Sequence, residues 1–321
     1  MSVTIAGETF APGTRRRILI PLAPLYNQMM LHLPVVVLNG RTPGPRLWIL
    51  GTIHGDELVG IEVARRLLRL VAPERLAGTL LAVPMVNVPG MLYQSRYLPD
   101  RRDLNRSFPG SKRGSLAARI ARLILDTIVD GSTHGIDLHT GAIHRSNLPQ
   151  VRANLDDPAT RACAEAFGAP VAIHATERDG SVRQAASARG VTTLLYEAGE
   201  ALRHDEEALR VGVEGVMRVM KAIGMIRGPV PRGRKPLLVR KSHWVRAAKT
   251  GYFVVDAKLG DRVKKGQRLG TTHLRLHPDF VSEEERAAEV PVRAPFAGIV
   301  IGRVENPLVS LADGIVHVAA L

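Results

Sequence analysis

The stretch Gly51-Thr52-Ile53-His54-Gly55-Asp56-Glu57 decides how the rest of this chain is organised. It follows an apolar run, residues 47–50, that predicts a buried strand. It precedes residues 58–71, whose apolar side chains recur at helical spacing. His54 and Glu57 therefore lie where a strand ends and a helix begins, which is where ligand crevices form in open α/β sheets. Because an imidazole and a carboxylate at this spacing can reach one ion, the stretch predicts part of a zinc site.

Strands and helices alternate along the chain around this stretch. Apolar runs predict further strands, and amphipathic spacing predicts further helices. The expected strands cover residues 15–22, 33–40, 80–87, 135–141, 171–175 and 191–196, and the expected helices cover residues 115–130, 157–167 and 204–223. This alternation predicts an α/β fold with a mostly parallel or mixed sheet that helices cover on both faces. Pro84 indicates a strand end or a sheet edge, and residues 89–114 predict a long functional loop.

The composition changes after residues 228–233, a stretch rich in Pro and Gly that predicts a linker. We therefore expect an α/β domain with a short β leader over residues 1–228 and a small all-β domain over residues 229–321. Residues 259–267 and 292–300 resemble the turn-and-strand signatures of biotinyl and lipoyl carrier domains, which have the barrel-sandwich fold. The hairpin that carries the modified lysine of those domains is not found between Thr271 and Pro291, so we favour a structural module.

Length and composition fit a globular protein. The chain has 321 residues, and 45% of them are hydrophobic, which is enough to bury a large core. No segment approaches the roughly 18 uninterrupted apolar residues of a membrane span, and the first ten residues lack the pattern of a secretory signal. Cys163 is the only cysteine, so we interpret it as a buried apolar side chain rather than a catalytic thiol. We expect a cytoplasmic protein.

The net charge of +14 has two explanations. One is nucleic-acid binding, and the other is attraction of an anionic substrate. Most basic residues are scattered along predicted helices, where a solvated face is the usual interpretation. The densest basic run, residues 232–249, has Trp244 as its only aromatic residue besides one histidine. We therefore favour a small anionic substrate over nucleic acid.

Asp137-Leu138-His139 can complete the metal site from another strand. Side chains two apart on a strand face the same side, so Asp137 could orient an imidazole through its second nitrogen while His139 binds the metal. Three protein ligands leave one position for water, which is the pattern of catalytic zinc, and zinc lowers the pKa of that water towards neutrality. Either fragment alone arises often by chance. Together, each at the end of a predicted strand, they favour a zinc site.

Two further groups suit hydrolysis of an amide. Glu197 follows an apolar strand and is a candidate general base; the alternative is an ordinary surface carboxylate. In Asp103-Leu104-Asn105-Arg106, a guanidinium and an amide could hold a substrate carboxylate. Arg96, upstream in the same loop, could stabilise an oxyanion. The alternative for this loop is a solvated, Arg-rich surface.

With these residues, the chain resembles the succinylglutamate desuccinylase/aspartoacylase family, relatives of the zinc carboxypeptidases. The family pattern of an HxxE pair, DLNR, DLH and a later catalytic Glu appears here as residues 54–57, 103–106, 137–139 and 197. The resemblance implies a carboxypeptidase-like α/β fold and one zinc ion per chain, with these site residues: His54, Glu57 and His139 as zinc ligands, Glu197 as general base and acid, Asn105 and Arg106 as carboxylate contacts, and Arg96 as the group that polarises the carbonyl. Candidates for the acyl-group contacts are Tyr97, His144 and Arg183.

The function predicted from the sequence is zinc-dependent hydrolysis of the amide bond of a small N-acylated amino acid or a related carboxylate-bearing amide. A metallocarboxypeptidase that cleaves peptides shares the whole metal site and is the first alternative. A non-catalytic binding protein with a relic site is the second. The sequence leaves open the acyl group, the amine, the native metal and the oligomeric state, for which a homo-oligomer is one possibility.

Overall fold

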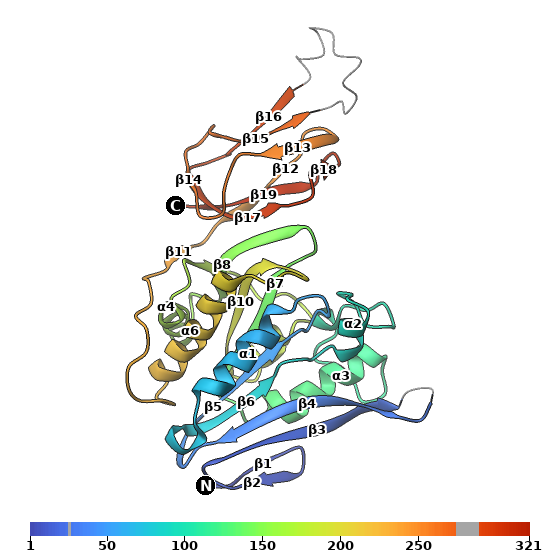
Figure 1. Ribbon diagram of the computed structural model, residues 1–321, viewed down its shortest axis with the longest axis vertical. Coiled ribbons are helices and arrows are strands. Elements are labelled where there is room, and N and C mark those ends of the chain that lie inside the picture. The colour runs from blue at the N-terminus through green and yellow to red at the C-terminus, as the bar shows by residue number, and fades with distance from the viewer. Residues whose placement is uncertain (25–26, 274–288) are drawn as a thin grey trace.

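The computed structural model describes residues 1–24, 27–273 and 289–321. The described chain forms a large mixed sheet with helices on both faces and further antiparallel strands towards the C-terminus (Figure 1). None of the described helices is long and apolar enough to cross a membrane. The helices are α1 (Val59–Leu70), α2 (Val88–Leu92), α3 (Leu116–Ile124), α4 (Pro158–Phe167), α5 (Val182–Ser187) and α6 (Glu206–Ala222), with 3-10 turns η1 (Pro73–Arg75) and η2 (Leu104–Arg106) and a π-helical turn η3 (Leu125–Val129) that continues α3.

Among the strands up to α6, the first two pair with each other in a small sheet of their own, and the others build most of the larger sheet. The strands up to α6 are β1 (Val3–Ile5), β2 (Glu8–Phe10), β3 (Thr14–Pro24), β4 (Met30–Asn39), β5 (Thr42–Gly51), β6 (Ala77–Val83), β7 (His134–Gly141), β8 (Arg145–Ala153), β9 (Val171–His174) and β10 (Thr192–Glu200). The later strands are β11 (Leu237–Val239), β12 (Ser242–Arg246), β13 (Gly251–Val255), β14 (Arg262–Val263), β15 (Arg268–His273), β16 (Glu289–Arg293), β17 (Gly298–Val304), β18 (Leu308–Val309) and β19 (Gly314–Ala320).

The centre of the larger sheet is parallel. Strands β10, β7, β5 and β6 lie side by side in that order, all parallel, whereas β4 and β3 extend the sheet beyond β6 as antiparallel strands. On the other side, β8 pairs antiparallel with β10 and parallel with β9. The carboxyl ends of β5 and β7 therefore lie together, as expected for the two ligand-bearing segments.

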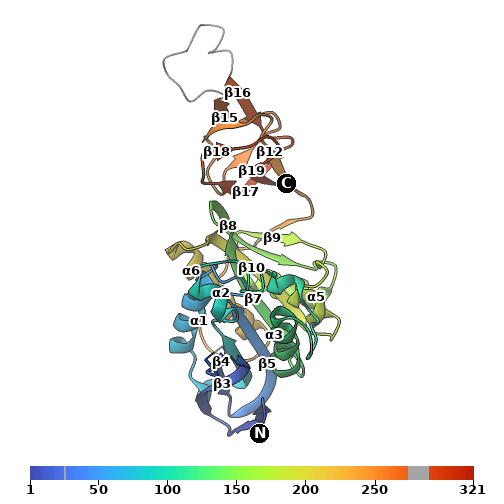
Figure 2. The same cartoon turned by 90° about the vertical axis from the view of Figure 1, so that its right-hand side faces the viewer.

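Helices cover both faces of this sheet because side chains on a buried strand alternate between two apolar layers. On β5, Leu47 and Ile49 belong to the cluster that includes buried residues of α1, α4 and α6. Trp48 and Leu50 belong to the cluster on the opposite face, which includes residues of α3 and α5. Figure 2 shows α1 and α6 on one side of the sheet and α3 and α5 on the other. The predicted fold class, an α/β sheet with a C-terminal all-β part, is confirmed.

The C-terminal strands continue the larger sheet and add a separate four-stranded sheet. Strand β17 pairs with β8, and β11 pairs with β9. The four-stranded sheet has the order β16-β15-β13-β18. The division predicted between residues 228 and 229 falls between α6 and β11, and we retain it as a proposal. Residues 274–288, which make up most of the region where the carrier hairpin was sought, lie outside the described residues.

Several details differ from the sequence prediction. Strand β8 and helix α5 were not expected, and the loop over residues 89–114 contains the end of α2 and the turn η2. Strand β10 runs on to Glu200 instead of ending at Tyr196, because it is paired with β7 and β8 on its two sides. Pro84 directly follows β6, which lies between β5 and β4, so it marks the end of a strand rather than the edge of the sheet.

Candidate active site

The segment after β5 turns tightly and presents His54 and Glu57 on the same side. The backbone N–H of Glu57 donates to the carbonyl of His54 at 3.1 Å. A Cβ on Gly55 would lie 2.1 Å from the backbone of Gly90 in α2, so only glycine allows this close approach. Helix α1 begins two residues after Glu57. This tight turn thus places the side chains of His54 and Glu57 at the junction between β5 and α1.

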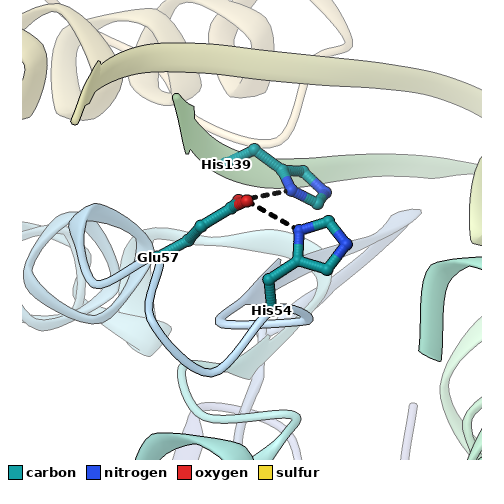
Figure 3. Close-up of side chains that lie close together, drawn as sticks. All are labelled: His54, Glu57 and His139. Atoms are coloured by element: carbon teal, nitrogen blue, oxygen red, sulfur yellow. Dashed lines mark hydrogen bonds and ion pairs between the residues drawn. The ribbon is translucent and has the colours of Figure 1, made fainter. Parts of the chain in front are cut away.

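The carboxylate of Glu57 lies between two imidazoles (Figure 3). Its Oε1 is 2.7 Å from Nδ1 of His54, and its Oε2 is 2.7 Å from Nδ1 of His139. The donor atoms of the three residues all lie within 4.8 Å of one another, and the three side chains are buried. The structure therefore brings the three predicted metal ligands together from two segments 82 positions apart, across β5 and β7.

The second ring nitrogen of each histidine, Nε2, which is not the one near Glu57, also lies close to a carboxylate. Nε2 of His139 is 2.7 Å from Asp137 Oδ2, and Nε2 of His54 is 3.2 Å from Asp103 Oδ1. A carboxylate only accepts hydrogen bonds, so an imidazole that binds a cation through Nδ1 would carry its proton on Nε2 and donate it to its outer carboxylate. Two nitrogens and one carboxylate oxygen, each held by an outer partner, form a donor set that fits zinc.

Electrostatics explain why these groups coexist out of water. Burial opposes the charge of Glu57, but the neighbouring His54 and His139 outweigh it and hold the pKa of Glu57 well below its usual range. Burial likewise disfavours the charged form of His139, yet Asp137 and Glu57 raise its pKa well above the ordinary value. The pKa of His54 is also raised, against burial, by Glu57 and Asp103. Such a buried set is stable only when opposite charges compensate one another.

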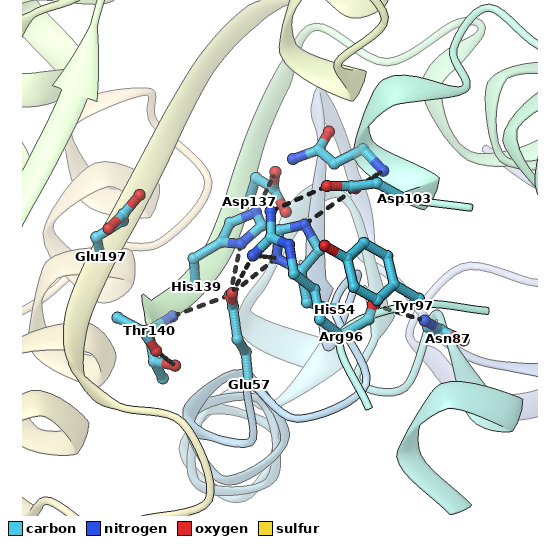
Figure 4. Close-up of polar contacts among 12 residues, drawn as sticks. His54, Glu57, Asn87, Arg96, Tyr97, Asp103, Asp137, His139, Thr140 and Glu197 are labelled. Carbon is cyan, nitrogen blue, oxygen red and sulfur yellow. Dashed lines mark hydrogen bonds and ion pairs between the residues drawn. The ribbon is translucent and has the colours of Figure 1, made fainter. Parts of the chain in front are cut away.

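Arg96 lies beside this cluster, as Figure 4 shows. Its guanidinium Nη1 is 3.2 Å from Glu57 Oε1, and its Nη2 donates to Asp103 Oδ2 at 3.0 Å. Asp103 thus links His54 to Arg96, a role that the sequence analysis did not assign. The signal was present in the DLNR motif, where the Asp103 carboxylate also accepts the backbone N–H of Asn105 at 2.8 Å and caps η2.

Glu197 lies on β10, opposite His139 on the parallel strand β7 and opposite Gln150 on β8. Its Oε2 accepts a hydrogen bond from Asn147 Nδ2 at 2.6 Å, and Arg152 Nε lies 3.6 Å from Oε1. Neither Asn147 nor Arg152 was singled out from the sequence, because strand β8 was not predicted.

One cavity of about 670 Å³ collects the predicted site residues. Its lining includes His54, Glu57, His139, Arg96, Asn105, Arg106 and Glu197. Asp137 is fully buried next to His139 instead of lining the cavity. Asn105 Oδ1 accepts the backbone N–H of Val182 at 3.0 Å, which leaves the amide nitrogen of Asn105 for a ligand.

Of the three candidates for acyl-group contacts, Arg183 lines the cavity and the other two do not. Arg183 lines the cavity, and its guanidinium donates to the backbone carbonyls of Ala175 and Thr176. Tyr97 and His144 are exposed and do not belong to the lining. Sequence reasoning could not make this separation, because it depends on how distant loops fold around the cavity.

The cavity wall is strongly basic. Only Glu57 and Glu197 are acidic among the lining residues, whereas the lining contains these seven arginines: Arg96, Arg106, Arg145, Arg152, Arg178, Arg183 and Arg240. The segment after α6 contributes Arg240 and Trp244, and the Arg145 guanidinium lies 5.2 Å from the centroid of the Trp244 ring. A confined basic surface of this kind attracts anions.

The fold and this site together define an α/β protein with a buried His-Glu-His cluster of metal-ligand type at the carboxyl ends of parallel strands. The chain belongs to the succinylglutamate desuccinylase/aspartoacylase family, because the model of that family's catalytic domain matches residues 43–223. The resemblance stated from the sequence motifs is thereby confirmed. The family consists of deacylases, so the chain is assigned to the amide-cleaving hydrolases.

Individual relatives extend the similarity beyond the catalytic domain. The chain is 29% identical over 299 residues to the N-alpha-acetyl-L-2,4-diaminobutyric acid deacetylase of Halomonas elongata, covering 89% of this chain and 85% of that protein. A crystal structure of a succinylglutamate desuccinylase/aspartoacylase from Rhodobacter sphaeroides matches with a TM-score of 0.82 and 27% identity over 95% of each chain. The product-bound ectoine utilization protein of Ruegeria pomeroyi has the same fold, with a TM-score of 0.83 at 24% identity over 96% of this chain and 95% of that one.

Proposed function

We propose that this protein is a zinc-dependent deacylase that hydrolyses the amide bond of a small N-acylated amino acid or a related carboxylate-bearing amide. The observation that carries the proposal is the Glu57 carboxylate lying 2.7 Å from Nδ1 of both His54 and His139. The outer nitrogens of both rings face carboxylates. This is the donor set of a catalytic zinc with three protein ligands.

In this proposal His54, Glu57 and His139 would hold one zinc ion, which would supply a Lewis acid for the substrate carbonyl and lower the pKa of water at the site. Glu197 accepts the proton of the attacking water on one carboxylate oxygen and passes it to the departing amine nitrogen. The guanidinium of Arg96 offsets the negative charge that develops on the carbonyl oxygen.

Asn105 and Arg106 hold the carboxylate of the substrate. Burial lowers the pKa of Arg106, but the guanidinium stays protonated because its ordinary pKa lies far above neutrality. The basic cavity supports an anionic substrate as the partner. The Halomonas relative is named for an acetylated diaminobutyrate, so an acetyl group is the first acyl group to test here.

A metallocarboxypeptidase that acts on peptides remains the competing proposal, because it needs the same metal site. The cavity of about 670 Å³ favours the small substrate, since Trp244 and Arg240 from the C-terminal segment form part of its wall. Its volume is within the range usual for sites that enclose small ligands. A peptide substrate that extends out of the cavity would have to pass these two side chains.

The test combines metal analysis with a substrate panel. The purified protein is assayed on N-acetyl-L-2,4-diaminobutyrate, N-succinyl-L-glutamate, N-acetyl-L-aspartate and a short peptide with a free carboxyl end. We expect about one zinc per chain, hydrolysis of at least one N-acyl amino acid, loss of activity after chelation and recovery with zinc. Zinc-free protein that hydrolyses nothing would support the relic site, and cleavage of the peptide alone would support the carboxypeptidase.

The role of Glu197 is tested in the same assay. Glu197→Gln should keep zinc and lose turnover by about 100-fold or more, because general acid–base catalysis contributes about 10²–10⁴-fold. Retained turnover would remove Glu197 from the mechanism. We keep the cytoplasmic location as a further proposal.

A further inference from the structure

Strand β8 connects the site to the C-terminal sheet. Asn147, on β8, lies opposite Gly199 of β10 on one side and opposite Gly302 of β17 on the other. It is 5% exposed. The buried side chain of Asn147 therefore lies between β10, which carries Glu197, and the C-terminal strand β17.

The two ends of the Asn147 amide have different neighbours. Nδ2 donates to Glu197 Oε2 at 2.6 Å. Oδ1 lies next to Gly302, where an added Cβ would be 2.9 Å from Oδ1, 3.2 Å from the Cβ of His317 and 3.4 Å from the ring of Trp244. The amide fits in this orientation because residue 302 has no side chain.

This arrangement suits a residue that aims a carboxylate. A glutamate has several rotamers, and a donor that fixes Oε2 leaves Oε1, which lies 3.6 Å from Arg152 Nε, to exchange a proton. Because the amide is neutral, it fixes Oε2 without adding a second positive charge to that of Arg152, which would weaken the base further. We propose that Asn147 positions Glu197 for proton transfer and that β17 holds Asn147 in place through Gly302. This inference rests on the proposed role of Glu197 as general base.

The test compares three single variants on the best substrate of the panel above. Asn147→Leu removes the donor, and Asn147→Asp replaces it with an acceptor of the same shape. We expect kcat to fall by about 10- to 100-fold, since misplacement of a reacting group by about 1 Å costs that much, while KM and zinc content change less than about threefold. Gly302→Ala leaves the side chains of Asn147 and Glu197 unaltered and should lower kcat in the same way, because its Cβ would lie 2.9 Å from Asn147 Oδ1 and push the amide aside.

The matched control is Leu148→Ala. Leu148 lies on the same strand and packs against an apolar cluster that includes Ile301 and Ala319 of the C-terminal strands, but it does not line the cavity. This variant should lower the melting temperature and leave kcat within about twofold. Equal loss of kcat in Leu148→Ala and Asn147→Leu would show that general damage to the strand pairing, not positioning of Glu197, explains the effect.

A double variant separates this inference from the proposed function. If Asn147 acts through Glu197, adding Asn147→Leu to Glu197→Gln should lower the residual rate by less than about twofold. If Glu197→Gln loses turnover but Asn147→Leu keeps kcat within about twofold of the wild-type value, the positioning role fails and the proposed function stands. If Glu197→Gln keeps full turnover, Glu197 is not the general base and the positioning role fails, whereas the deacylase activity itself stands. A crystal structure of Asn147→Leu in which the Glu197 carboxylate keeps its orientation would also overturn the inference, whichever substrate is found.

Discussion

Asp137 and His139 lie two residues apart on β7, with the Asp137 Oδ2 atom 2.7 Å from Nε2 of His139 and both side chains buried. The alternation of side chains along a strand puts the carboxylate and the ring on the same side. His139 is thereby held by a partner that is not itself among the three clustered donors.

The first prediction concerns this pair. Asp137→Asn keeps the shape of the side chain but removes its charge, and it should weaken zinc binding by about 10- to 100-fold, as losses of such outer partners do. Competition with a chromophoric chelator measures the dissociation constant. Asp256→Asn, which changes an exposed carboxylate paired with Arg268, should leave zinc affinity unchanged. Equal affinity in wild type and Asp137→Asn would contradict the assignment.

Arg106→Ala should mainly raise KM for carboxylate-bearing amides. A hydrogen bond to a charged group contributes about 1.5–3 kcal/mol, so we expect an increase in KM of about 10- to 100-fold with little change in kcat. Steady-state kinetics on a carboxylate substrate and on its neutral amide analogue provide the measurement. The exposed Arg119 of α3 supplies a control substitution of the same kind. An unchanged KM in Arg106→Ala would rule out the carboxylate clamp.

Arg96→Ala should lower kcat by about 100- to 1,000-fold, the usual cost of removing an oxyanion donor. Arg96 also touches Glu57 and Asp103, so the zinc content of the variant has to be measured alongside its kinetics. Zinc should be retained. Loss of zinc in step with activity would instead assign Arg96 to the support of the metal ligands.

Asp205→Ala should affect stability and not catalysis. The Asp205 carboxylate accepts the backbone N–H of Ala208 at 3.0 Å and caps α6. Its loss should lower the free energy of unfolding by about 1 kcal/mol, measured by urea denaturation, with kcat unchanged. Glu207→Ala, an exposed change in the first turn of the same helix, should cost less. A destabilisation no larger than that of Glu207→Ala would show that the cap contributes nothing measurable.

The part of the fold predicted from the sequence is the part with strong local patterns. The run of residues 47–50 before His54 is apolar throughout, as expected for a strand buried on both faces, and α1 has regular helical spacing. The metal cluster could be anticipated for the same reason, because both histidines follow or end such strands. Where the motifs were short and local, the structure places their side chains together.

The parts that were missed depend on tertiary partners. Strand β8 contains Arg145, Asn147, Pro149 and Gln150 and has no regular alternation; it is buried only because β10, β9 and β17 pair with it. The contacts of Asn147 with Glu197 and Gly302 follow from that pairing, and no local sequence pattern predicts them. The same holds for Trp244, which reaches the cavity from the C-terminal segment.

The pairing of β11 with β9 and of β17 with β8 also bears on self-association. Without residues 229–321, β9 and half of β8 would present unsatisfied backbone donors and acceptors next to the apolar side chains of Val171 and Ile173. Bare edges of this kind recruit strands from other molecules. The C-terminal strands cover these two edges. We therefore expect a protein shortened to residues 1–228 to aggregate into inclusion bodies instead of forming an active fragment.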